Sequence, residues 1–177
     1  DDHRMSYENF DYIVVGAGSA GSVLANRLST DGKHNVLVLE AGRESHPWSR
    51  IPVGFAKLID NPAANWLYES EPEEGAADRK IPVPRGKLLG GSSSINGMIY
   101  IRSQPEDYDH WAQMGNRGWD AASTFPYFRK AENWEGPADA VHAKGGPLFT
   151  SQNRDKPELC EIAIEAGRQM GWAYRED

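Results

Sequence analysis

The stretch FDYIVVGAGSAGSVLANRLSTDGKHNVLVLEA, residues 10–41, decides the fold of this chain. Its apolar runs predict a strand over 12–15, a helix over about 19–29 and a strand over 36–39, with both strands buried on both faces. The turn before the helix has the spacing G-x-G-x-x-G, formed by Gly16, Gly18 and Gly21. The first glycine permits a tight turn, the second lets a pyrophosphate approach the backbone, and the third lets helix and strand pack closely.

An acidic residue, Glu40, follows the second strand about 20 residues after the third glycine, where a carboxylate accepts hydrogen bonds from both ribose hydroxyls of an adenosine. The first N–H groups of the preceding helix favour an anion beside the turn. Together these features predict a dinucleotide site rather than a purely structural strand-helix-strand unit. The motif leaves FAD and NAD open as ligands, because both carry an ADP half.

The composition excludes several classes of protein. The 177 residues carry a formal net charge of -7, so nucleic acid is not expected as a partner. No apolar run predicts a membrane span and no signal-peptide pattern precedes Met5, so we expect a soluble, cytoplasmic protein. Residues 1–5 are interpreted as an expression remnant or a disordered start, outside the fold.

The single cysteine and the histidines predict neither a disulfide nor a metal site. Cys160 lies in a helical apolar pattern with Leu159, Ile162 and Ala163, which indicates a buried or half-buried structural residue rather than a reactive thiol. The five histidines are scattered and lack paired ligand spacing, so no metal is expected.

Short elements are predicted after the first unit. Residues 43–65 are rich in proline and should be irregular, 66–68 should form a short strand, and 81–84 should be extended. We expect the loop over about 43–84 to cover a cofactor.

Three helices and one strand are expected in the remainder, over about 105–114, 121–134, 147–150 (the strand) and a helix opened by a capping box at 155–158. Asp107 and Asp109 have helical spacing, but acids in a first turn favour the helix N-terminus, so a structural role is predicted rather than acid-base catalysis.

A second glycine-rich stretch, RGKLLGGSSSINGMIY, occupies residues 85–100. Its glycines let the backbone approach a planar or anionic ligand, and its hydroxyls, amide and positive charges lie in reach. A flexible glycine-serine linker is the alternative, but leucine, isoleucine and methionine side chains make the stretch too apolar for one. A second binding segment is therefore predicted.

The pattern from Gly86 to Asn96 resembles the first signature of the glucose-methanol-choline oxidoreductases, FAD-dependent enzymes that act mostly on alcohols. Tyr100 and Asp109 stand at the family's positions, whereas Ser103 replaces the usual glycine, alanine or proline. The likeness covers nearly all of the chain from residue 11 to 177.

The resemblance implies a set of FAD-binding positions, with Arg85, Gly90 and Gly91 flanking the flavin contact. They are Gly16, Gly18, Ser19, Ala20, Gly21, Glu40, Ala41, Trp66, Arg85, Gly90, Gly91, Ser92, Asn96, Gly97, Met98 and Ile99. Ile95 stands where some relatives tether the flavin through a histidine, which implies non-covalent FAD.

The resemblance also implies an α/β fold, namely a Rossmann-like FAD-binding domain with a parallel sheet. Residues 6–177 would be the N-terminal FAD-binding portion of a larger two-domain enzyme. A C-terminal remainder, possibly a separate chain, would add the substrate domain and the catalytic histidine, so no catalytic residue is expected here. A sheet without its later strands would expose apolar edges and faces.

The implied reaction is oxidation of a CH–OH group of a small-molecule alcohol, with oxygen or another electron acceptor. Three alternatives stay open: a flavin-containing lyase of the same family, a non-catalytic FAD-binding subunit, and a nicotinamide dehydrogenase. The last gives no reason for the pattern at 86–96.

Overall fold

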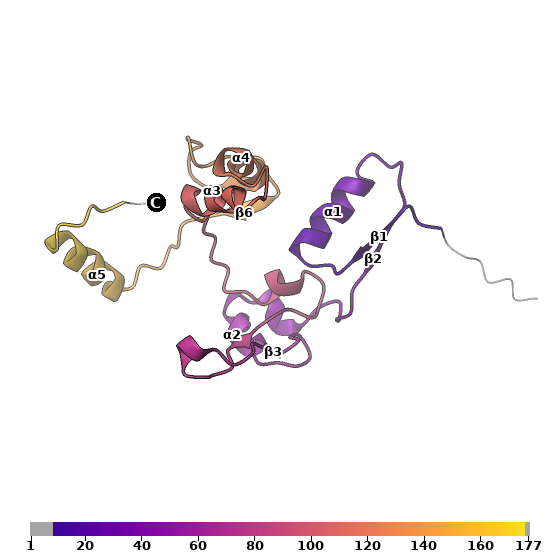
Figure 1. The fold of residues 1–177 in the computed structure, drawn as a ribbon, viewed down its shortest axis with the longest axis horizontal. Helices are drawn as coiled ribbons and strands as arrows, with labels where there is room; N and C mark the ends of the chain where they lie inside the picture. Colours follow the sequence, from indigo (N-terminus) through magenta and orange to yellow (C-terminus); the bar gives the residue numbers. More distant parts are fainter. Residues whose placement is uncertain (1–8, 176–177) are drawn as a thin grey trace, which may run out of the picture. The chain divides into compact units, whose positions relative to one another are not determined.

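The computed structural model describes residues 9–175, which divide between Ile99 and Tyr100 into two compact units (Figure 1). The first unit holds both glycine-rich turns, and the second holds the helices α3, α4 and α5. The remnant or disordered start predicted for residues 1–5 lies outside the described residues.

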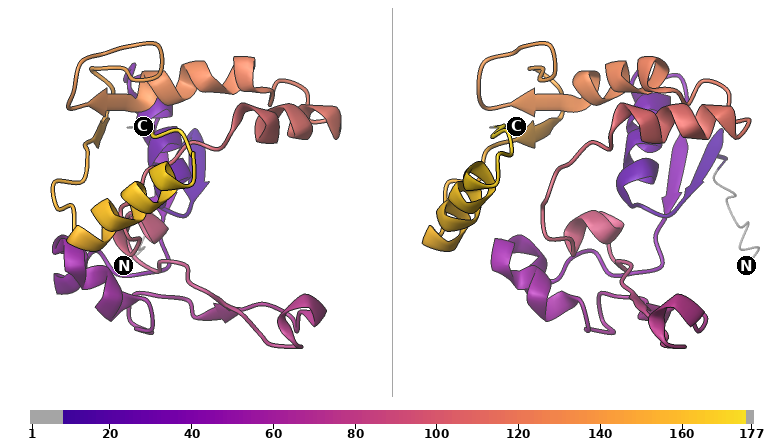
Figure 2. Two further views of the ribbon diagram at one scale, coloured as in Figure 1. Left: turned by 90° about the vertical axis from the view of Figure 1, so that its left-hand side faces the viewer. Right: turned by 60° about the vertical axis from the view of Figure 1, so that its left-hand side comes forward.

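The first unit opens with the predicted strand-helix-strand arrangement. Strand β1 (Tyr12–Val15), helix α1 (Ser19–Ser29) and strand β2 (Val36–Leu39) have the expected bounds. The strands are parallel, with Tyr12 opposite Val36 and Val15 opposite Leu39. Helix α1 lies along this pair, as Figure 2 shows. The prediction for residues 12–39 is therefore confirmed.

The prediction that both strands are buried on both faces is wrong for the described chain. Val14 is buried, but Ile13 is 61% exposed and Val15 83% exposed. In residues 9–175 these two strands pair only with each other, so most of their apolar side chains lack a covering layer. This is the exposure expected of a sheet without further strands.

Short elements make up the rest of the first unit, as its prolines predict. They are η1 (Pro47–Arg50), η2 (Pro52–Gly54), α2 (Phe55–Leu58), β3 (Tyr68–Glu69), η3 (Glu74–Ala76), β4 (Pro82–Val83) and η4 (Gly91–Ser94). β3 and β4 are antiparallel. The strand expected at 66–68 begins at Tyr68 instead, because Leu67 has φ +56°, which a strand residue does not adopt.

A small core holds this segment together. It consists of Leu58, Ala64, Leu88 and Ile95. Asn65, also buried, joins three backbone segments: its Oδ1 accepts from the N–H of Leu67 (3.0 Å) and of Arg85 (3.0 Å), and its Nδ2 donates to the Ile59 carbonyl. One amide side chain thus satisfies three backbone groups.

The second unit contains α3 (Pro105–Gln113), α4 (Ala121–Ala131), β5 (Glu132–Trp134), β6 (Leu148–Thr150) and α5 (Glu158–Gln169). Tyr108 is the buried centre of the α3 and α4 contact, and its ring lies 5.5 Å from Phe125 and 5.8 Å from Phe128. The helix predicted over 121–134 is three residues too long, because Glu132 is extended and begins a strand parallel to β6.

The structure places Asp107 in the first turn of α3, as predicted, whereas Asp109 lies beyond that turn. Asp107 Oδ2 accepts from the N–H of Gln104 (3.0 Å), before the first turn of α3. Asp109 Oδ1 accepts from the N–H of Ala121 at the start of α4 (3.0 Å). Both carboxylates therefore fix helix starts.

Two predictions about α5 are wrong. The capping box at 155–158 does not form: Pro157 precedes the helix and no side chain caps it in the described chain. Cys160 is exposed rather than buried, because α5 presents its apolar residues to solvent, with Leu159 74% exposed. The predicted stop at Gly171 is confirmed by its φ of +82° and by the Trp172 N–H bond to the Gly167 carbonyl (3.0 Å).

Replacing Asn65 with alanine should lower the free energy of unfolding by about 3 kcal/mol, because it orphans two backbone N–H groups and a carbonyl near the core. Asn153→Ala is the matched control, since the exposed Asn153 makes one such bond, to the Asp155 N–H. Chemical denaturation measures both. An Asn65→Ala loss no larger than the control's would contradict the role given to Asn65.

Candidate functional site

The first glycine-rich turn has the geometry that its spacing predicts. Gly16 has φ +93°, in the left-handed region that favours glycine. A Cβ on Gly21 would overlap the Gly16 carbonyl oxygen and lie 3.2 Å from Val14 Cγ1. Gly21 therefore allows α1 to pack against the end of β1.

The second turn also requires glycine. Gly90 has φ +88° and Gly91 φ +54°. A Cβ on Gly86 would overlap the backbone carbonyl of Gly91, and the Gly86 N–H donates to Ser92 Oγ (3.1 Å). The chain thus folds back on itself over residues 86–92.

The two turns meet backbone to backbone. A Cβ on Gly91 would lie only 2.8 Å from the Gly18 Cα, so Gly91 has no room for a larger side chain without a shift, whereas a Cβ on Gly18 would lie 3.8 Å from the Gly91 Cα, an ordinary contact. The Gly90 N–H donates to the Ala17 carbonyl (2.9 Å), and the hydroxyls of Ser19 and Ser93 bond to each other. Residues far apart in sequence therefore form one glycine-lined surface.

Glu40 connects this surface to the end of β2. Its Oε2 accepts from the Ala17 N–H (2.9 Å) and its Oε1 from the Gly42 N–H (2.8 Å). Each carboxylate oxygen has a further lone pair, so the group can still accept hydrogen bonds from a ligand. The Leu89 N–H donates to the Arg43 carbonyl (3.0 Å), which ties the same loop to the second turn.

The electrostatics beside the first turn favour an anion. Helix α1 begins after Gly18 with no side-chain cap, and no acidic residue lies in its first turn. The first N–H groups of a helix lack partners within the helix, and they carry partial positive charge. The N-terminus of α1, at Ser19 and Ala20, therefore offers donors to a ligand group such as a phosphate.

Trp66 lies in an aromatic and cationic group. Its ring stacks on Tyr68 at 5.8 Å between centroids, and Lys87 Nζ lies 4.4 Å from the Trp66 ring centroid. The Trp66 N–H donates to the Arg85 carbonyl (2.9 Å), so this group is hydrogen-bonded to the segment that leads from β4 into the second turn. A half-open indole face is suited to stacking against a planar ligand.

The segment after the second turn has an unusual backbone. Asn96 Oδ1 accepts from the Met98 N–H (3.0 Å), and Met98 has φ +59° although it is not glycine. Met98 is 57% exposed and Ile99 82% exposed. A hollow of about 140 Å³ is lined by residues that include Phe55, Asn96 and Met98.

The structure brings most of the predicted site residues together, but not as one continuous group. The first turn, Glu40 and residues 90–92 are linked by direct contacts, whereas Trp66 joins them through Arg85 and Lys87. Ala41 follows Glu40 and is exposed. Sequence reasoning missed Ser93, whose hydroxyl bonds to Ser19; its place in a three-serine run was the available signal.

Among residues 9–175 no group of three or more histidine, cysteine, aspartate or glutamate side chains is placed to hold a metal ion.

In that same range, every helix is too short or too polar to cross a lipid bilayer.

Comparison with known proteins gives consistent matches. A family model described as GMC oxidoreductase matches residues 10–177. The oxygen-dependent choline dehydrogenase of Sinorhizobium fredii is 44% identical over 168 residues, which make up 94% of this chain and 31% of that protein. Its namesake in Photobacterium profundum is 42% identical over 171 residues, 95% of this chain and 30% of that protein.

Solved structures agree. The crystal structure of pyridoxine 4-oxidase from Mesorbium loti has a TM-score of 0.82 and 37% identity, and the match covers 91% of this chain and 32% of that chain. A crystal structure of formate oxidase has a TM-score of 0.80 at 26% identity, over 95% of this chain and 31% of that chain. The chain therefore belongs to the GMC oxidoreductase family, with the predicted Rossmann-like α/β fold, and spans about a third of these relatives' length.

Replacing Gly91 with alanine should destabilise the first unit by about 2 kcal/mol or more, because a Cβ meets the Gly18 backbone and the residue has a positive φ. Gly75→Ala, at a position with nothing within 4 Å and an ordinary φ, is the matched control. Thermal unfolding compares the two. Equal melting temperatures for both variants would show that the turns are not in contact.

Proposed function

We propose that this chain supplies most of the FAD site of an FAD-dependent oxidoreductase that acts on CH–OH groups. The observation that carries the proposal is the backbone contact between the two glycine-rich turns, beside the uncapped N-terminus of α1. FAD, when bound, supplies an acceptor for the hydride removed from an alcohol carbon. The chain's own residues bind and orient it.

The glycine-lined surface fits the pyrophosphate. We infer that the amides of Gly18, Ser19, Ala20 and Gly21 and the Ser92 hydroxyl face the phosphate oxygens. A side chain larger than hydrogen at Gly91 would fill the space between the turns, because its Cβ would meet the Gly18 backbone. Gly16 and Gly90 support the turns through their positive φ values.

The adenosine half is assigned to the ends of β2 and β3. Glu40 would accept hydrogen bonds from the ribose hydroxyls, beside Ala41, through lone pairs left after its bonds to Ala17 and Gly42. Its negative charge would repel a 2′-phosphate. Trp66, 39% exposed and in contact with Tyr68 and Lys87, is assigned to this half as an aromatic contact.

The flavin ring is assigned to Asn96, Gly97, Met98 and Ile99, with Arg85 upstream. The positive φ of Met98 turns the local backbone, and we infer that amides of this segment face the ring. A backbone N–H near the ring would stabilise the anionic reduced flavin. The loop over about 43–84 is proposed to cover the cofactor.

Non-covalent binding is part of the proposal. Ile95 is a hydrocarbon side chain, 5% exposed in the core of the first unit, and has no group that could bond to a flavin. Acid precipitation of the purified protein should leave all flavin in the supernatant. Flavin retained in the pellet would contradict this.

The partners are proposed from the relatives. Choline is the first alcohol to test because two relatives are named choline dehydrogenases, and pyridoxine is the second. Oxygen or another acceptor would take the electrons. A C-terminal remainder of the same enzyme would supply the substrate domain and the catalytic histidine. The single cysteine and the net charge of -7 support a cytoplasmic protein without a nucleic-acid partner.

The function is tested on the complete purified protein. We expect a yellow protein with flavin absorbance bands, bleached anaerobically by one of the two alcohols and restored by an electron acceptor. Bound flavin with no bleaching by any alcohol in a wide panel would favour a lyase or a non-catalytic FAD-binding subunit. A colourless protein that binds nicotinamide cofactors would overturn the proposal.

Glu40→Gln should weaken FAD binding at least about tenfold, because an amide NH₂ placed against the Ala17 or Gly42 N–H cannot accept and the ribose loses a charged acceptor. Fluorescence titration of the apoprotein measures the affinity. Glu161→Gln, an exposed acid on α5, is the control and should bind FAD normally. Equal affinities would remove Glu40 from the ribose site.

A further inference from the structure

The connection between β5 and β6 is unusual for a parallel pair of strands. Parallel neighbours are usually joined by a crossover helix. Here residues 135–147, named the crossover segment, contain neither helix nor strand. Some of their backbone polar groups have backbone partners, such as the Ala143 carbonyl, which accepts from the Trp134 N–H (2.9 Å), and others are bound by side chains.

Two arginines and one aspartate supply many of those partners. Arg129 on α4 donates to the carbonyls of Asp139 and Ala140, and Arg102 donates to the Val141 carbonyl (2.7 Å). Asp139 Oδ1 accepts from the N–H groups of Val141 (2.7 Å) and His142 (2.6 Å). The tip of the crossover segment is thus held by charged groups.

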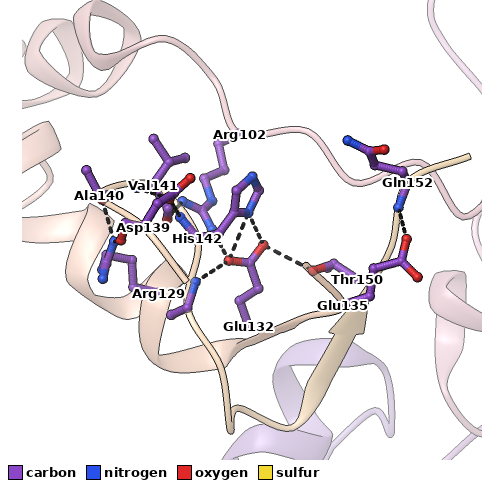
Figure 3. Close-up of polar contacts among 11 residues, drawn as sticks. Arg102, Arg129, Glu132, Glu135, Asp139, Ala140, Val141, His142, Thr150 and Gln152 are labelled. Carbon is purple, nitrogen blue, oxygen red and sulfur yellow. Dashed lines mark hydrogen bonds and ion pairs between the residues drawn. The ribbon is translucent and has the colours of Figure 1, made fainter. Parts of the chain in front are cut away.

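These contacts converge on Glu132, the first residue of β5, whose side chain is fully buried (Figure 3). Its carboxylate accepts from Arg102 Nη2 (2.9 Å) and from the Ala143 N–H (2.9 Å), and it lies 3.1 Å from His142 Nδ1. Thr150 on β6 donates to it as well (3.1 Å). One carboxylate links the segment before α3, the crossover segment and both strands.

Apolar contacts contribute less than polar contacts to holding the crossover segment in place. Val141, its largest aliphatic side chain, is 53% exposed. The ring contact of the segment is His142 stacked on Trp134, at 4.3 Å between centroids. A segment held mainly by polar contacts opens when its central acceptor is lost.

We propose that the crossover segment is a strap that the Glu132 carboxylate holds in place, and that neutralising this carboxylate releases the strap locally while α3 and α4 stay folded. Without the charge, Arg102 keeps no buried counter-ion, and the Ala143 N–H loses a charged acceptor. We expect the helices to stay folded because their contact is the aromatic cluster around Tyr108, which meets the Glu132 network through Arg102, 5.9 Å from the Phe128 ring centroid.

The test is hydrogen-deuterium exchange of the complete protein carrying Glu132→Gln. Amides of residues 139–146 should exchange at least about tenfold faster than in the wild type, and amides of α4 (121–131) should keep wild-type rates. Trypsin should also cleave after Lys144 sooner. Unchanged exchange in the strap, or equal acceleration in α4, would overturn the proposal.

Two variants keep the test decisive. Glu135→Gln removes the carboxylate of the first residue of the crossover segment, which accepts from the Gln152 N–H and Arg154, outside residues 139–146, so exchange of amides 139–146 should stay unchanged. Thr150→Val removes one donor but keeps the charge, so it should fold and accelerate strap exchange less than Glu132→Gln. If Glu132→Gln does not fold, the wild type in acid replaces it, and strap protection that does not fall as Glu132 is protonated overturns the proposal.

Lowering the pH neutralises the Glu132 carboxylate without a mutation, so the pH dependence of strap exchange is a second test. Burial raises the pKa of Glu132, but the Ala143 N–H, His142, Thr150 and the Arg102 charge together hold it below its usual value. Its contribution to stability is therefore present above about pH 4.3 and is lost as the pH falls through the lower folded pKa. Asp139 is a second titratable carboxylate in the crossover segment, and the His142 and Val141 N–H groups lower its pKa.

The difference between wild type and Glu132→Gln isolates Glu132 from Asp139. Strap protection, corrected for intrinsic exchange, should fall in the wild type as the pH drops through the lowered pKa of Glu132 and converge on that of the variant. If the strap stays more protected in the wild type than in Glu132→Gln, by the same factor in acid as at neutral pH, the role of the ionised carboxylate is contradicted.

Discussion

Direct contact between the backbones at Gly18 and Gly91 is the constraint on which the first unit depends. It brings together two turns that are separated in sequence by the whole of β2, α2 and β3. Because no side chain intervenes, amides and hydroxyls line the surface, with Glu40 binding both Ala17 and Gly42 behind it. We propose that this surface recognises a ligand by its phosphates and ribose, as in dinucleotide-binding folds.

Buried polar groups do much of the organising in both units. Asn65 joins three backbone segments near a core of only four buried apolar residues, and Glu132 joins four segments in the second unit. Apolar packing is incomplete by comparison: β1 and α5 have exposed apolar faces, on which Val15 and Leu159 are largely in solvent. Covering layers from a longer chain, such as that of the relatives, would supply what these faces lack.

Local rules account for what the sequence predicts well. The bounds of β1, α1 and β2 follow from apolar periodicity and the three glycines of one short stretch, and the stop at Gly171 follows from one residue's freedom at positive φ. The family follows from the serine and glycine pattern at 86–96, and the match over residues 10–177 confirms it.

The remaining features depend on partners distant in sequence. The sequence around Glu132 does not indicate that Arg102 and Thr150 contact its side chain. The helix predicted from that sequence therefore ends three residues later than α4 does. The exposure of Cys160 depends on what packs against α5, which its own periodicity does not specify. The contact of Ser19 with Ser93 likewise requires both turns to be folded.

The most direct test of the central claim is a crystal structure of the complete protein purified with its natural ligand. The account predicts FAD whose pyrophosphate lies within hydrogen-bond distance of the α1 N-terminal amides and of Ser92, with the ribose hydroxyls on Glu40. FAD bound elsewhere, or no flavin with residues 90–92 facing solvent, would contradict it.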